Sequence, residues 1–340
     1  MKAGWMKHRW FEEEMRVAPG MLVEGKWITE RQQEDREGRF VRPSTTFRDR
    51  VTADGSSGYK AEAGRYHLYV SWACPWAHRT AILRKLKGLE DAISLAAVGS
   101  FMGDDGWAFY DEPGVVPDTV NGAHYLREVY LKADPYYTGR VTTPVLWDKE
   151  TQTIVNNESR DIIRMFDHEF DAVPGAKAEV DFCPGDLREE VDATIGAIYE
   201  PINNGVYRSG FATTQGAYEE AVTQLFDVLD RWEAVLGERR YLCGDRVTEA
   251  DWCLFPTLLR FDPVYHGHFK CNLRRIVDYL NLWGYLKDLY QQPGVIETVY
   301  LDHIKRHYYR SHESINPTSI VPKGPILDFE EPHGRERYSG

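Results

Sequence analysis

The fold is decided by residues 66–79, which read YHLYVSWACPWAHR. Residues 66–70 are an apolar run that predicts a buried strand, and from Trp76 onward apolar residues recur at helical spacing as far as Leu89. Cys74 therefore stands at a strand-to-helix turn, where Pro75 suits the first helical position. Unpaired backbone N–H groups and the positive end of the helix dipole favour a thiolate at this point, so Cys74 is a candidate nucleophile.

The turn carries a single thiol. A second cysteine three residues after Cys74 would make a two-thiol redox motif, but Ala77 occupies that position. No neighbour can resolve a mixed disulfide on Cys74, so the second thiol is expected to come from outside the chain. The competing interpretation is a buried structural cysteine before a helix, and the flanking proline and two nearby tryptophans weigh against it.

Composition narrows the class of protein. The chain has 340 residues, of which 42% are hydrophobic and 28% charged, as in a globular protein of one or two domains. A formal net charge of -12 argues against a nucleic-acid or anionic-membrane surface. No apolar run approaches the ~20 residues that span a bilayer, and residues 1–8 lack the apolar core of a signal peptide, so the cytoplasm is the expected location.

The five cysteines are widely spaced and show neither a disulfide framework nor a zinc pattern. We therefore predict no metal and no structural disulfide. A reducing compartment fits this usage, and glutathione is the abundant small thiol there.

The order of the predicted elements indicates an α/β thioredoxin-like domain with a long loop after its second strand. In chain order we expect a strand at 66–72, a helix at 76–88, a strand at 92–98, a loop to about 122, a helix at 123–132, strands at 144–147 and 153–155, and a helix at 158–170. Proline is disfavoured inside a central strand, so Pro144 must begin its strand. Thioredoxin-like folds place a cis proline there, opposite the nucleophilic cysteine, and we expect Pro144 to be cis.

An all-helical domain is predicted after this one. Expected helices lie at 187–199, 217–236, 273–291 and 295–305. A further helix is expected to begin at a capping box, with Thr248 as its N-cap residue and Asp251 at the third helical position. The whole chain is thus divided into an N-terminal extension at 1–60 with a short strand near 40–42, an α/β domain at 61–175, an all-α domain at 176–315 and an irregular tail at 316–340.

This two-domain plan resembles the cytosolic glutathione transferase superfamily, and six ordered segments are similar to its xi class, the glutathionyl-hydroquinone reductases. These segments are residues 63–70, 74–79, 139–148, 156–159, 203–207 and 303–309. The resemblance runs from about residue 38 to 320, with small departures at Trp72, Thr143 and Arg160 that remove no functional group. It implies a homodimer.

The resemblance also implies roles for individual residues. Glutathione would be held by Glu158 at its ammonium and by Ser159 with the free N–H groups of its helix at a carboxylate. The backbone of Val145 would pair with the glutathione cysteinyl unit as a short strand. Further glutathione contacts are implied for Trp107 and Arg127, and contacts with the quinol ring for Tyr207, Tyr265 and Tyr308.

The implied reaction starts with attack of the Cys74 thiolate on the sulfur of a glutathionyl-hydroquinone. Tyr207 and Tyr308 would assist proton transfer to the leaving ring, and a second glutathione would release oxidised glutathione. Two alternatives stay open at this point. One is an omega-like dehydroascorbate reductase or deglutathionylase, which uses the same single-thiol turn. The other is a non-catalytic scaffold with a transferase fold.

Overall fold

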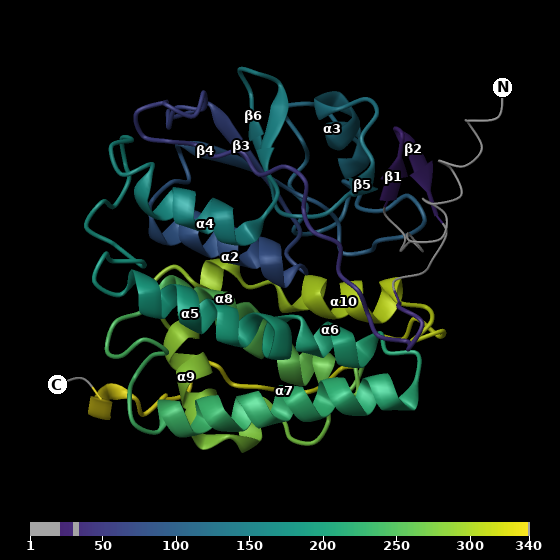
Figure 1. Cartoon of the computed structure of the whole chain (residues 1–340), viewed down its shortest axis with the longest axis vertical. Helices are drawn as coiled ribbons and strands as arrows, with labels where there is room; N and C mark the ends of the chain where they lie inside the picture. The colour runs from purple at the N-terminus through teal and green to yellow at the C-terminus, as the bar shows by residue number, and fades with distance from the viewer. Residues whose placement is uncertain (1–20, 30–33, 339–340) are drawn as a thin grey trace.

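In the computed structural model of the chain, residues 21–29 and 34–338 are described. They form an α/β lobe and a helical lobe that lie one above the other in the view of Figure 1. Residues 1–8, which were examined for a signal peptide, lie outside the described part.

A four-stranded sheet forms the centre of the α/β lobe, with strand order β4-β3-β6-β7. β3 is parallel to β4 and antiparallel to β6, and β7 is antiparallel to β6. Every residue of β3 is buried, because alternate side chains point into two different hydrophobic clusters on the two faces of the sheet. The strands are β3 (Tyr66–Val70), β4 (Ile93–Ala97), β6 (Val145–Asp148) and β7 (Thr153–Asn156).

Helices cover both faces of this sheet. On one face lie α2 (Pro75–Leu86) and α4 (Ser159–His168), which pack against each other. On the other face lies α3 (Leu126–Ala133), whose buried Leu126 and Val129 join the second cluster. The Thr143–Pro144 peptide bond before β6 is cis, as the sequence predicted.

The helical lobe follows without a further sheet. It contains α5 (Arg188–Ile198), α6 (Gly205–Gly210), α7 (Gln215–Leu236), α8 (Glu249–Arg260), α9 (Leu280–Tyr290) and α10 (Leu301–Ser311). Short turns of other helix types are η1 (Tyr199–Asn203), η2 (Phe261–Tyr265), η3 (Ile276–Asp278), η4 (Ile296–Thr298) and η5 (Glu336–Tyr338). Thr248 and Asp251 form the predicted capping box at the start of α8.

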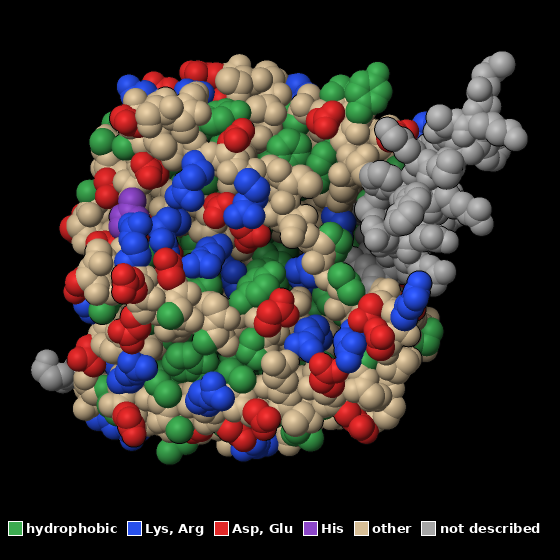
Figure 2. All heavy atoms as spheres, in the orientation of Figure 1, with side chains coloured by type: hydrophobic (Ala, Val, Ile, Leu, Met, Phe, Trp, Pro, Cys, Tyr) green, Lys and Arg blue, Asp and Glu red, His purple; other side chains and the backbone are tan. Residues whose placement is uncertain are grey.

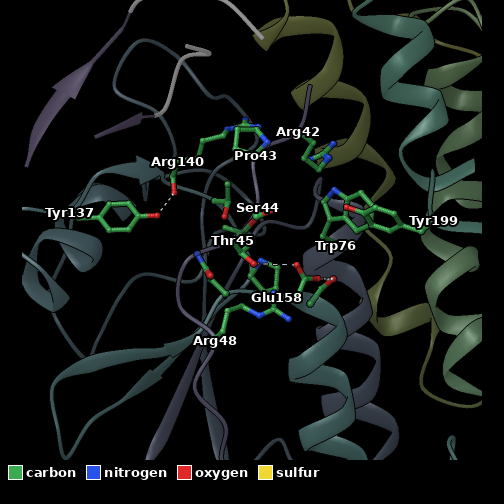
Figure 3. A pocket seen from close by; sticks show the side chains of 15 residues that line it. Arg42, Pro43, Ser44, Thr45, Arg48, Trp76, Tyr137, Arg140, Glu158 and Tyr199 are labelled. Carbon is green, nitrogen blue, oxygen red and sulfur yellow. Dashed lines mark hydrogen bonds between the residues drawn. The ribbon is translucent and has the colours of Figure 1, made fainter. Parts of the chain in front are cut away.

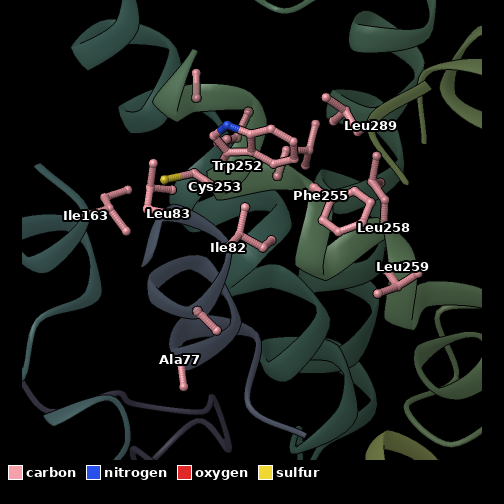
Figure 4. Close-up of a cluster of buried hydrophobic side chains, with 14 of the residues drawn as sticks. Ala77, Ile82, Leu83, Ile163, Trp252, Cys253, Phe255, Leu258, Leu259 and Leu289 are labelled. Atoms are coloured by element: carbon pink, nitrogen blue, oxygen red, sulfur yellow. The ribbon is translucent and has the colours of Figure 1, made fainter. Parts of the chain in front are cut away.

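One hydrophobic cluster joins the two lobes. Figure 4 shows Ile82 and Leu83 of α2 facing α8, with Trp252, Cys253 and other α8 side chains on the opposite side. α8 is buried at every position, so it forms the core of the interface rather than its surface. The position of the Cys74 turn relative to the helical lobe follows from this shared core.

The N-terminal part of the chain reaches both lobes. β1 (Met21–Val23) and β2 (Lys26–Ile28) form a small antiparallel sheet with β5 (Gly139–Arg140). Further along, Arg42 donates from Nε to Asn204 Oδ1 in the helical lobe at 2.9 Å. Thr45 Oγ1 donates to Glu158 in the α/β lobe at 3.3 Å.

Some boundaries differ from the sequence predictions. The strand expected near 40–42 is wrong, since Phe40 makes only an isolated bridge with Glu34 and the nearby strands lie at 21–28. The helix expected at 273–291 is split, because Tyr279 adopts extended backbone angles between η3 and α9. The helical segment 199–210 was not predicted as a separate unit, and its π-helical start has no simple periodicity.

The C-terminal tail has little regular structure but is anchored. Phe329 is buried among aromatic rings that include Tyr290, with centroids 5.0 Å apart. Arg335 is buried as well and donates to the carbonyl oxygens of Leu236, the last residue of α7, and of Arg239 just beyond it. The carbonyl groups at the end of a helix have no hydrogen-bond partner within the helix, and Arg335 provides donors for them here.

Candidate active site

Cys74 lies where the sequence predicted. It is the N-cap residue of α2 with an extended backbone, and Pro75 follows as the first helical residue. Its sulfur lies 3.4 Å from the carbonyl oxygen of Thr143, the residue before the cis proline. Cys74 is partly exposed, whereas the other four cysteines are buried, and burial raises the pKa of each of those four thiols. Cys74 is therefore the thiol best placed to react.

The backbone of this turn is held by a buried arginine from the other lobe. Arg260, at the end of α8, donates to the carbonyl oxygens of Trp72 and Ala73 at 2.9 Å each. It also donates to Pro256 O at 2.8 Å and lies 3.2 Å from His78 Nδ1. Burial and the nearby Arg260 charge lower the pKa of His78 well below its usual range, so His78 is neutral.

A polar cavity of about 830 Å³ is lined in part by Trp76, two residues after Cys74, and by Thr143, whose carbonyl oxygen contacts the Cys74 sulfur. In Figure 3, Arg42 and Arg140 lie on one side of it, and Glu158 and Arg48 lie on the other. Figure 2 shows a hollow between the lobes with hydrophobic side chains at its floor and basic side chains near its rim. The cavity therefore offers both guanidinium groups and a carboxylate, as the charged ends of a zwitterionic peptide require.

The start of α4 contributes the acidic side. Glu158 is the N-cap of α4, and its carboxylate accepts the N–H of Arg160 at 3.2 Å. Ser159 is the first helical residue, and its hydroxyl lies 3.4 Å from Nη1 of Arg79. Free N–H groups and a hydroxyl at a helix start can hold a carboxylate, and the Glu158 carboxylate can bind an ammonium group.

An aromatic cavity of about 900 Å³ adjoins the polar one and is lined in part by Cys74 itself, Trp107, Tyr207 and Tyr308. The hydroxyl oxygens of Tyr207 and Tyr308 are 2.5 Å apart, and that of Tyr265 is 3.0 Å from Tyr308. Burial raises the pKa of all three phenols, so they are neutral at physiological pH and able to donate protons. Tyr265 is fully buried and does not line the cavity, but it contacts Tyr207 and Tyr308, which do.

The remaining predicted glutathione residues have distinct positions. Trp107 stacks on His307, with ring centroids 4.7 Å apart, and lines the aromatic cavity. Val145 is buried at the start of β6, directly after the residues that line the polar cavity. Arg127 lines neither cavity and instead pairs with Asp105 at 2.9 Å. The glutathione roles of these three residues stay predictions.

Several residues at the site were missed by sequence reasoning. Arg42 and Arg140 line both cavities, and Arg79 and Arg260 hold the site from buried positions. Arg79 and Arg140 lie in the segments 74–79 and 139–148 named above, which was the signal that could have found them, whereas Arg42 and Arg260 lie outside those six segments. Thr143 also lines both cavities, and within the described residues its buried Oγ1 has no hydrogen-bond partner. Its place before Pro144 was the signal that could have found it.

One side-chain group in the described part of the chain has a spacing compatible with a metal ion. It consists of Asp167 and His168 at the C-terminal end of α4 and Asp181 in the loop that follows, and none of them lines either cavity. Asp167 already accepts the N–H of Phe182 at 3.0 Å. The absence of a metal stays a prediction.

Comparison with known proteins places the chain in a family. Two family models match it, the glutathione S-transferase N-terminal domain over residues 73–169 and the C-terminal domain over residues 215–288. Glutathionyl-hydroquinone reductase YqjG of Escherichia coli is 54% identical over 325 residues, which cover 93% of this chain and 98% of that protein. Glutathionyl-hydroquinone reductase PcpF of Sphingobium chlorophenolicum is 53% identical, covering 90% and 96%. The solved xi-class transferase of Natrialba magadii has 53% identity and a TM-score of 0.88, covering 95% of this chain and 98% of that one.

The chain belongs to the xi class of glutathione transferases. Its α/β lobe and helical lobe are the N-terminal and C-terminal domains of that superfamily, as the sequence predicted. The E. coli protein has also been solved with glutathione bound, and that structure matches this xi-class chain with a TM-score of 0.86 at 52% identity, covering 93% and 99%. Among the described residues, none of the helices has the length and apolar character needed to cross a bilayer.

Proposed function

We propose that this protein catalyses the glutathione-dependent reduction of glutathionyl-hydroquinones to free hydroquinones. The observation that carries the proposal is one partly exposed cysteine that lines an aromatic cavity, which shares five lining residues with a polar cavity. The polar cavity suits a zwitterionic tripeptide, and the aromatic cavity suits a planar ring. The two curated relatives above are named glutathionyl-hydroquinone reductases, which supports the same reaction here.

The first half-reaction is a substitution at sulfur. The Cys74 thiolate attacks the sulfur of the glutathionyl-hydroquinone, a Cys74–glutathione disulfide forms, and the bond between that sulfur and the ring carbon breaks. The ring carbon keeps the electron pair and takes up a proton. Tyr308 is a suitable source because its hydroxyl lines the aromatic cavity and is hydrogen-bonded to two further phenols.

The second half-reaction regenerates the thiolate. A second glutathione thiolate attacks the glutathione sulfur of the mixed disulfide, forms oxidised glutathione and expels Cys74 as a thiolate. Electrons balance over the cycle, since two glutathione units are oxidised to one disulfide and the arylated carbon is reduced to C–H. The lack of a second cysteine in the Cys74 turn requires this external thiol.

Glutathione contacts are assigned on the same basis. The ammonium group of its γ-glutamyl unit would bind Glu158, and the neighbouring carboxylate would bind Ser159 with the N–H groups that start α4. Val145 would pair with the cysteinyl backbone, and Trp107 would pack on the tripeptide. We assign Arg127 only a long-range electrostatic contact, since it lines neither cavity.

The decisive experiment supplies glutathionyl-menadiol and glutathione and measures free menadiol by chromatography, with dehydroascorbate tested in parallel. We expect release of menadiol and of oxidised glutathione in equal amounts, with a Cys74–glutathione adduct seen by mass spectrometry when glutathione is limiting. Turnover of dehydroascorbate without release of menadiol would reject the proposal in favour of an omega-like reductase.

The scaffold alternative is tested by the reactivity of Cys74. Alkylation with iodoacetamide should be faster than that of free cysteine at neutral pH, and Cys74→Ser should abolish turnover. A thiol no more reactive than free cysteine, together with no turnover of glutathionyl-menadiol by the unmodified protein, would support the scaffold.

Assembly and location are part of the same proposal. A homodimer is expected for this superfamily, and light scattering on the purified chain should give twice the mass of one chain. The cytoplasm is supported by five unpaired cysteines and by the need for reduced glutathione. The proposed division assigns glutathione binding to residues 61–175 and the ring-facing tyrosines to residues 176–315.

A further inference from the structure

The two cavities are adjoining parts of one cleft, because the same residues border both of them. Cys74 itself lines the aromatic cavity. The residues shared by both linings are Arg42, Trp76, Arg140, Thr142 and Thr143. A ligand in the aromatic cavity therefore meets two arginines that also face the polar cavity.

The aromatic cavity carries more positive charge than a hydroquinone ring requires. Its lining holds Arg42 and Arg140 but no aspartate or glutamate. Burial, and after it the nearby charge of Arg42, lowers the pKa of Arg140 to about 10, which leaves it protonated at neutral pH. The ring of a hydroquinone is uncharged, so its binding makes no use of these two cations, which also line the polar cavity.

Arg42 is held in position yet keeps hydrogen-bond donors available. Its Nε donates to Asn204, and its guanidinium carbon lies 4.8 Å from the ring centre of Tyr207 and 5.1 Å from that of Trp76. In the described part of the chain, neither of its Nη groups has a hydrogen-bond or carboxylate partner. A planar guanidinium with both ends unoccupied is suited to a carboxylate.

The chemistry of the cycle names the anion that must enter this cavity. In the first half-reaction the ring leaves the glutathione sulfur on the side opposite to Cys74. In the second, a thiolate must attack the same sulfur in line with the disulfide bond, again opposite to Cys74. The departing ring carbon and the entering sulfur therefore occupy the same position. The second glutathione, a thiolate with two carboxylates and one ammonium group, follows the uncharged ring into the same cavity.

We propose that the aromatic cavity is also the binding site for the second glutathione and that Arg42 binds one of its carboxylates there. This inference rests on the proposed function, because it concerns the second half of that reaction. One cavity thus accepts a flat neutral ring on its tyrosines and tryptophans and then an anionic tripeptide at its arginine edge. Free hydroquinone should accordingly compete with glutathione for the Cys74–glutathione form of the protein.

The test separates the two half-reactions in Arg42→Gln. Stopped-flow mixing of reduced protein with glutathionyl-menadiol measures the first, and mixing of the isolated Cys74–glutathione adduct with subsaturating glutathione measures the second. Loss of a charge-assisted contact should slow the second half-reaction about tenfold, and the first half-reaction by a much smaller factor. Arg42→Lys should restore part of the loss because it keeps the charge.

Two controls locate the effect. Arg50→Gln makes the same charge change at an exposed arginine of the same segment that lines neither cavity, and it should leave both steps unchanged. 2-Mercaptoethanol, a neutral thiol without carboxylates, should reduce the adduct of Arg42→Gln as fast as it reduces the adduct of the unmodified protein. Monoesters of glutathione at the glycyl or the glutamyl carboxylate then show which carboxylate Arg42 binds, since the relevant ester becomes insensitive to the substitution.

The outcomes are distinguishable. If the adduct forms and Arg42→Gln is reduced by glutathione at the rate of the unmodified protein, the second-glutathione site is rejected while the proposed function stands. An equal loss with glutathione and with 2-mercaptoethanol also rejects it, because a damaged cleft rather than a missing cation would then be responsible. If no adduct ever forms from glutathionyl-menadiol, the proposed function itself fails.

Discussion

Replacing Arg260 with methionine should weaken both the stability of the protein and the reactivity of Cys74. The side chain is fully buried and joins α8 of the helical lobe to the turn that carries Cys74. Methionine fills a similar volume without donors, so the carbonyl groups of Trp72, Ala73 and Pro256 lose their charged partner. Among the described residues around this turn, no other cation donates to three backbone carbonyl groups.

The size of the effect follows from these contacts. Removing one member of a buried, hydrogen-bonded charged network costs about 3–5 kcal/mol in the free energy of unfolding. An unfolding entropy of about 2.1 cal/mol/K per residue gives ~0.7 kcal/mol/K for a chain of 340 residues. The melting temperature should therefore fall by about 4–7 °C. The freed turn should also slow alkylation of Cys74 by about tenfold, because small displacements of a reacting atom have large effects on rate.

Differential scanning calorimetry and the iodoacetamide rate at fixed pH measure the two effects. Arg231→Met, at an exposed position of α7, makes the same chemical change and should shift the melting temperature by less than about 1 °C. Arg260→Lys keeps the charge and should recover part of both losses. If Arg260→Met melts and reacts like Arg231→Met, the turn is held by packing alone and the reasoning is refuted.

Three further outcomes are expected. Tyr308→Phe removes the hydroxyl between two other phenols and should lower kcat for glutathionyl-menadiol about a hundredfold; an unchanged kcat would exclude it as the proton source. Glu158→Gln, made in the Cys74→Ser background, keeps an oxygen for the helix cap but should weaken glutathione binding at least about tenfold, as measured by fluorescence titration. A Kd within a factor of two of that of Cys74→Ser alone would show that Glu158 does not bind the ammonium group. Burial lowers the pKa of His67 to about 4, so its neutral form stabilises the fold above pH 6.5 and that contribution is lost as pH falls toward 4. By urea unfolding, the unmodified protein should lose about 2 kcal/mol more than His67→Gln between pH 7 and pH 5, and parallel losses would contradict this.

Local patterns in the chain predicted the elements that carry the chemistry. The strand, turn and helix around Cys74 were predicted because apolar spacing and a proline at the first helical position act over a few residues. The same holds for the capping box at Thr248. The start of α4 at Glu158 and Ser159 was likewise expected, directly after a strand. Boundaries failed where the backbone departs from a regular period, as at Tyr279 between η3 and α9.

Tertiary structure alone decided which charges and hydroxyls meet. Arg42 comes from a polar segment without periodicity, yet it lines the cleft beside Cys74 because contacts such as the bond to Asn204 fix it across both lobes. Tyr207 and Tyr308 are separated by 101 positions, and their 2.5 Å contact depends on how α6 and α10 pack. Short-range propensities set each helix and strand, whereas the distance between such groups follows from the burial of a core shared by the two lobes.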